Sequence, residues 1–132
     1  MLIIFSSIPF LHIMFIFHMK MTQTPSKISN NTKFYPFLRD AVGAMDGTHI
    51  NCCPSVADCE ASCDYKGHIT QNCLVICNFN MAFCYVFSGW DGSTTDSTML
   101  NGARITDLPV PRGKYYLAGA SFPMCDTLLM PY

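Results

Sequence analysis

The sequence predicts a mixed α/β fold in which an antiparallel sheet is followed by a helix and a further strand. Residues 41–46, 68–78 and 82–87 are apolar or alternating runs separated by turn-forming residues, a pattern typical of strands. A helix-start pattern follows at residues 93–96, ahead of another strand-like run at 114–118. The 132 residues suit one modest domain, and a hydrophobic content of 50% excludes general disorder.

The first 19 residues carry no charged side chain and are long enough to span a bilayer as a helix. They lack the basic start and small-residue cleavage site of a secretory signal, and Pro9, His12 and His18 weaken a membrane helix. The basic residues that follow would keep the remainder cytoplasmic. Residues 1–20 are therefore either a membrane anchor or a hydrophobic extension unrelated to the domain behind it.

The domain itself is expected to begin after an exposed linker. Residues 21–33 are rich in Ser, Thr and Asn, as exposed linkers are. Residues 34–38 form an aromatic patch that we expect to pack on the core. The boundaries that follow are an extension over 1–20, a linker over 21–33 and one domain over 34–132.

The first predicted strand, residues 41–46, ends in Asp46, which Gly47 follows at once. Burial of an unpaired carboxylate costs several kcal/mol, so Asp46 should be paired, hydrogen-bonded or metal-bound. Gly47 permits either a sharp turn or the close approach of a ligand. The alternative is that Asp46 only caps the following turn. Residues 51–66 are turn-rich and predicted to be irregular.

The remaining elements follow in a simple order. Residues 68–78 and 82–87 are predicted as antiparallel strands, because only a short turn at residues 78–80 joins them. Residues 93–96 have the form of a capping box, which predicts a short helix ending at Leu100 or Ala103. A Pro-rich loop precedes the strand at 114–118, and loop is expected from Gly119 onward. This order matches the opening half of an RNase H-like fold whose closing helices are missing.

Charge and cysteine usage narrow the function classes. A net charge of −1 with 8 Lys and Arg residues is a poor match for a free-standing nucleic-acid binder. Contact with DNA would need a metal ion or further sequence. The eight cysteines are compatible with disulfides, a metal site or buried thiols. No C-x-x-C pair occurs, and Cys73, Cys77 and Cys84 fall in strand-like runs, which favours reduced thiols.

Six segments occur in the order in which a known family carries them: 26–30 (SKISN), 34–37 (FYPF), 43–50 (GAMDGTHI), 66–72 (KGHITQN), 89–97 (GWDGSTTDS) and 113–118 (GKYYLA). Over residues 24–132 the chain resembles the DDE endonuclease domain of PIF/Harbinger-type transposases and of nucleases domesticated from them. The resemblance implies a nuclear protein that acts on DNA phosphodiesters with Mg²⁺ or Mn²⁺. In such sites three carboxylates hold two divalent ions about 4 Å apart.

The resemblance also assigns site residues. Asp46 matches the first carboxylate and is the candidate catalytic and metal-binding residue. Asp96 matches a further family aspartate and is a second candidate ligand, although it could instead cap the helix together with Ser93. His49, next to the site, is expected to support it rather than to bind the metal.

The chain departs from the family pattern at several of these positions. Gly119 stands where the second carboxylate is expected, and the third, a Glu, would lie beyond Tyr132. Cys63, Thr95 and Thr98 replace basic residues of the family. These departures imply a degenerate copy without catalytic activity. Two alternatives stay open, namely a non-catalytic protein-interaction module that uses a sheet edge and the aromatic patch, and a membrane-tethered fragment.

Overall fold

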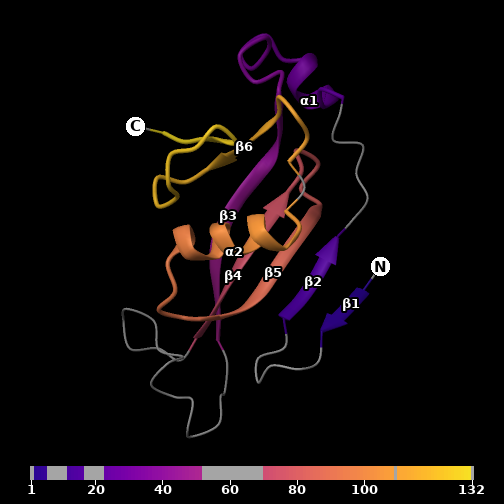
Figure 1. The fold of residues 1–132 in the computed structure, drawn as a ribbon. Helices are drawn as coiled ribbons and strands as arrows, with labels where there is room; N and C mark the ends of the chain where they lie inside the picture. The colour runs from indigo at the N-terminus through magenta and orange to yellow at the C-terminus, as the bar shows by residue number, and fades with distance from the viewer. Residues whose placement is uncertain (1, 6–11, 17–22, 52–69, 109, 132) are drawn as a thin grey trace, which may run out of the picture.

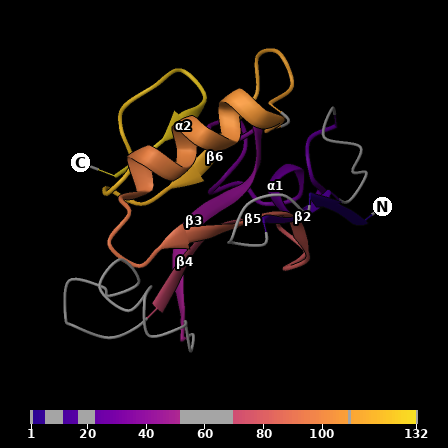
Figure 2. The ribbon, with the colours of Figure 1, turned by 60° about the horizontal axis from the view of Figure 1, so that its bottom comes forward.

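A computed structural model of the chain describes residues 2–5, 12–16, 23–51, 70–108 and 110–131. Its strands form one seven-stranded sheet in the order β1-β2-β5-β4-β3-β6-β7. The longer helix, α2, packs on one face of this sheet (Figures 1 and 2). The strands are Leu2–Phe5 (β1), His12–Ile16 (β2), Ala41–Asn51 (β3), Thr70–Cys77 (β4), Phe83–Asp91 (β5), Tyr115–Ala118 (β6) and Leu128–Leu129 (β7), and the helices are Ser26–Ser29 (α1) and Asp96–Thr106 (α2).

The predicted order of elements is confirmed. Strands β3, β4 and β5 form an antiparallel meander, with Asp46 opposite Val75 and Val75 opposite Val86. After α2, strand β6 returns parallel to β3 and pairs Leu117 with Ala44. Strand β7, in the stretch predicted as loop, is parallel to β6. This mixed α/β arrangement is compatible with a partial RNase H-like fold.

Strand β3 is longer than predicted, so Asp46 lies in its middle rather than at its end. Residues 44–51 pair with β4 without interruption, because Gly47 stays extended instead of turning. A Cβ at Gly47 would overlap the Asp96 carboxylate and lie 3.3 Å from Met99 Cε. The absence of a side chain at Gly47 therefore lets α2 pack close to β3. The predicted turn after Asp46 is wrong.

The N-terminal strands join the sheet rather than standing apart from it. Strand β2 pairs antiparallel with β5, with Met14 opposite Phe87, and β1 pairs with β2. The edge of β5 offers unpaired backbone groups, and an Ile- and Phe-rich segment readily forms strands. Residues 2–5 and 12–16 therefore extend the sheet of the domain at β5, and the domain boundaries stay a prediction. None of the helices that the structure describes has the length and hydrophobicity of a transmembrane segment.

Helix α2 encloses the core between itself and the sheet. The largest buried side chains come from both layers: Leu74, Ile76, Tyr85, Met99, Leu100 and Tyr116. The helix continues past Gly102 to Thr106, beyond the predicted end. A Cβ at Gly102 would lie only 2.5 Å from Trp90 Cζ2, so this glycine lets α2 pack directly on the indole ring. Gly102 marks a contact and not a helix end.

Two short segments differ from expectation. The predicted linker contains the single turn α1, whose Ile28 is buried. The aromatic patch does not pack on the core, because Phe34, Tyr35 and Phe37 are 43%, 46% and 78% exposed. The segment is instead held by polar contacts, such as the Tyr115 hydroxyl that donates to the Phe37 carbonyl at 3.1 Å.

The cysteines in the strands are reduced thiols, as predicted. Cys73 and Cys84 are buried and Cys77 is half-buried, and none forms a disulfide. Burial raises the pKa of the Cys73 thiol, so this side chain behaves as a small hydrophobe. The predicted turn-rich stretch lies outside the described residues, together with its four cysteines, Cys52, Cys53, Cys59 and Cys63.

Candidate functional site

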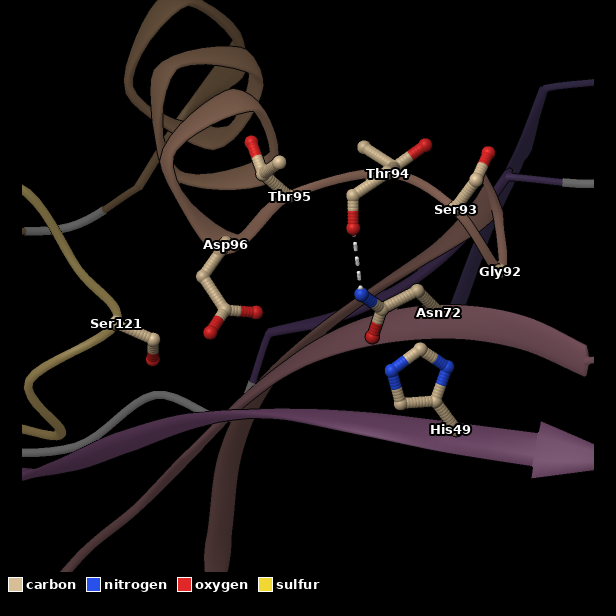
Figure 3. A pocket seen from close by; sticks show the side chains of 8 residues that line it. All are labelled: His49, Asn72, Gly92, Ser93, Thr94, Thr95, Asp96 and Ser121. Atoms are coloured by element: carbon tan, nitrogen blue, oxygen red, sulfur yellow. Dashed lines mark hydrogen bonds between the residues drawn. The ribbon is translucent and has the colours of Figure 1, made fainter. Parts of the chain in front are cut away.

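A pocket of about 390 Å³ opens where the start of α2 meets strands β3 and β4 (Figure 3). Its walls come from three separate parts of the chain: His49 and Asn72 on the strands, residues 92–96 at the turn into α2, and Ser121 after β6. Two of the predicted site residues, His49 and Asp96, line it. Asp46 and Gly119 do not.

Asn72 is the buried polar group of this pocket. Its side chain is 2% exposed, and its Nδ2 donates to the Thr94 carbonyl at 2.9 Å. Since that carbonyl can only accept, the amide orientation is determined, and Oδ1 points away from Thr94. Among the described residues Oδ1 has no hydrogen-bond donor. An unpaired buried acceptor costs about 1–3 kcal/mol, so this atom is a sign of a site rather than of packing.

Sequence reasoning missed Asn72. The residue lies within an apolar strand-like run, where an asparagine is out of place, and it ends the family segment at residues 66–72, so two signals could have found it. Its cross-strand partner is His49, whose Nδ1 lies 3.2 Å from Thr70 Oγ1. The hydrogen bond to Thr70 orients the imidazole at the edge of the pocket.

Asp96 is the first residue of α2, and its carboxylate lies over Gly47. The helix cap is Thr95, whose Oγ1 accepts from the Thr98 amide at 3.3 Å. The predicted capping box, with Ser93 as the cap, is therefore displaced by two residues. Because Thr95 performs the capping, the Asp96 carboxylate is left facing the pocket, near the positive end of the helix dipole.

Asp46 lies on the other face of the sheet. Successive side chains of a strand alternate between faces, so Asp46 points away from the face that Gly47 and His49 share. Its carboxylate is exposed, and its Oδ1 accepts from the Gly47 amide at 3.0 Å. The structure thus separates Asp46 from Asp96 by the thickness of the sheet.

Gly119, in contrast, comes directly after the β6 residue that pairs with Met45, the neighbour of Asp46. Strands β3 and β6 are parallel and pair Met45 with Ala118, so Asp46 and Gly119 are the next residues in the same register. Gly119 follows the last residue of β6, and the alternation of that strand, if continued by one residue, would place a side chain at 119 on the face of Asp46. Space exists for it, because a Cβ there would meet only Ser121 Oγ, at 3.8 Å.

The residues present do not fit a two-metal centre. Such a centre needs several carboxylates that converge on one point. The described part of the chain contains no group of three or more His, Cys, Asp or Glu side chains that could hold a metal ion. Asp46 has a glycine where its neighbouring ligand would stand, and Asp96 faces the opposite side.

Comparison with known proteins identifies the family. The sequence pattern of the DDE superfamily endonucleases matches residues 45–132, which include Asp46, Asp96 and Gly119. The chain belongs to this DDE endonuclease family. Nucleases of the DDE superfamily generally use divalent metal ions, so the poor fit at Asp46 is a departure from the family.

Two curated relatives of this DDE domain are similar to the chain over a region of about the same length. The candidate nuclease HARBI1 of Rattus norvegicus and that of Mus musculus are each 28% identical over 93 residues, which is 68% of this chain. The aligned region is 27% of each relative, so the chain spans about a quarter of their length. No solved structure matches the chain.

Proposed function

We propose that this chain is a Harbinger-type DDE endonuclease domain that has kept the family fold but does not cleave DNA. Its ancestral activity is metal-dependent hydrolysis or strand transfer at DNA phosphodiesters. The observation that carries the proposal is that Gly119, the position that the resemblance matches to the second carboxylate, directly follows Ala118, the partner of Met45 on the neighbouring parallel strand.

The chemistry explains why this one substitution matters. A divalent ion activates water only when ligands hold it in place, and each ion in a two-metal site shares carboxylates with the other. Asp46 alone offers one exposed carboxylate. Asp96 does not supplement it, because it lies on the α2 face of the sheet. Exposed single carboxylates bind Mg²⁺ or Mn²⁺ too weakly to position a nucleophile.

Nicking of supercoiled plasmid DNA in Mn²⁺ or Mg²⁺ tests this proposal. We expect the full chain to nick no faster than its Asp46→Ala variant. Metal-dependent nicking that Asp46→Ala abolishes would contradict the proposal. The Gly119→Asp variant is measured for Mn²⁺ binding in the same experiment. Mn²⁺ binding that the unaltered chain lacks would support the assignment of position 119 as the second ligand position.

A second candidate function is a protein-interaction module, which the exposed aromatic side chains favour. Phe34, Tyr35 and Phe37 are exposed together on the segment before β3. Aromatic residues are enriched at the centres of protein interfaces. If this patch docks a partner protein, Phe37→Ser should abolish binding of that partner and leave the urea unfolding midpoint of the chain unchanged. Equal retention of the partner by the unaltered chain and by Phe37→Ser would exclude this function.

The location follows from the ancestry and is also a proposal. We infer a nuclear protein, with DNA as the ancestral partner, and treat membrane attachment through residues 1–19 as the rival. Cell fractionation separates the two. Retention of the full chain in salt-washed membranes would contradict a nuclear location.

A further inference from the structure

We propose that the pocket between α2 and strands β3 and β4 binds a guanidinium group, as carried by an arginine side chain. The proposal goes beyond the loss of DNA cleavage and does not depend on it, because it uses neither Asp46 nor position 119. It rests on three features of the pocket: an unpaired acceptor, a negative charge and the difference between these two acceptors.

The unpaired acceptor is Asn72 Oδ1. The Thr94 carbonyl holds the amide nitrogen at 2.9 Å, and Oδ1 is buried without a donor in the described part of the chain. Figure 3 shows this amide between Thr94 and the His49 ring, on the pocket side of β4. A carbonyl oxygen only accepts hydrogen bonds, so the ligand has to supply an N–H or O–H group.

The negative charge is that of Asp96. The residues that line the pocket include no Lys or Arg, and Asp96 is their one carboxylate. Asp96 is the first residue of α2, and its negative charge offsets the partial positive charge at the start of the helix, so that this end does not repel a cation. The Thr98 amide at this helix end already donates to Thr95 Oγ1, so it is not available to an anion. A cationic donor is therefore favoured over an anion.

The presence of two different acceptors favours guanidinium over ammonium. Asn72 Oδ1 is a neutral oxygen on β4, whereas the Asp96 carboxylate comes from the start of α2 and lies over Gly47. An ammonium group concentrates its donors and its charge on one nitrogen, whereas the planar guanidinium spreads five N–H donors over three nitrogens. One guanidinium can therefore donate to both acceptors through different nitrogens.

The test is a titration of the ¹⁵N-labelled full chain, followed at the side-chain NH₂ signal of Asn72. The probe is N-acetyl-arginine methylamide, with two matched ligands: the citrulline analogue, neutral and of the same shape, and the lysine analogue. We expect the arginine probe to shift the Asn72 signal and to bind at least tenfold more tightly than either analogue. Free arginine and an arginine-containing tripeptide then distinguish an amino-acid ligand from a peptide.

Two variants locate the charge. Asp96→Asn should weaken binding of the arginine probe at least tenfold, whereas Asp126→Asn, an exposed carboxylate outside the pocket, should leave it unchanged. Equal binding of the citrulline analogue, no shift at Asn72, or full affinity in Asp96→Asn would overturn the proposal. If Asp96→Asn fails to fold, the three ligands compared on the unaltered chain still decide the question.

Discussion

At the scale of single residues, the site depends on which side chains the sheet sends to each face. The alternation of β3 places Asp46 on one face and Gly47 on the other, and Gly47 leaves room for the Asp96 carboxylate. The importance of Asp46 and Gly47 could be predicted from their order in the sequence. Their separation from Asp96 could not, because it depends on how far β3 continues past Gly47.

The tight approach over Gly47 gives the first prediction. Gly47→Ala should lower the free energy of unfolding by about 1–3 kcal/mol, because the new methyl group overlaps Asp96 and presses on Met99. The measurement is urea denaturation. Gly119→Ala is the matched control, since the space around it is open, and it should change stability by less than about 0.5 kcal/mol. Equal effects of the two substitutions would contradict the account.

A buried tyrosine gives a pH prediction. Burial raises the pKa of Tyr116 to about 12, above its usual value of 10. Above pH 10 the unfolded chain therefore loses this proton while the folded chain keeps it, and stability falls as pH rises toward 12. Urea midpoints between pH 8 and 11.5 measure the slope. Tyr116→Phe should make it shallower, and an unchanged slope would contradict the assignment.

At the scale of elements, α2 shows what local sequence signals miss. Ser93 and Asp96 have capping-box spacing, yet Thr95 forms the cap, because β5 runs on to Asp91 and delays the start of the helix. Gly102 resembles a helix end but is a contact with Trp90. Both differences arise from neighbouring elements, so they could not be predicted from the helix segment alone. The existence and approximate position of the helix could.

The cap gives the third prediction. Thr95→Ala should destabilise the fold by about 0.5–2 kcal/mol, because the Thr98 amide loses its acceptor. Ser93→Ala, at the position that the sequence pattern favours as cap, should change stability by less than about 0.5 kcal/mol. Thermal unfolding of both variants measures the difference. A larger loss in Ser93→Ala would show that the cap lies where the pattern places it.

At the scale of the whole molecule, the central sheet could be predicted and its edges could not. The turn signals around β4 and β5 and the later helix determine the order of β3 to β6. Residues 2–5 and 12–16 carry an apolar run that suits a strand as well as a membrane helix, and only the open edge of β5 favours the strand. The two-residue strand β7 carries too short a signal to be detected.

We propose above all that this DDE-family sheet has lost its metal centre at the junction of β3 and β6. Thermal unfolding of the full chain across a Mn²⁺ titration tests it most directly, with Asp46→Ala as the control. We predict that Mn²⁺ changes the melting temperature of the unaltered chain and that of Asp46→Ala by the same amount. A Mn²⁺-dependent stabilisation present in the unaltered chain and absent in Asp46→Ala would show that Asp46 still belongs to a working metal site.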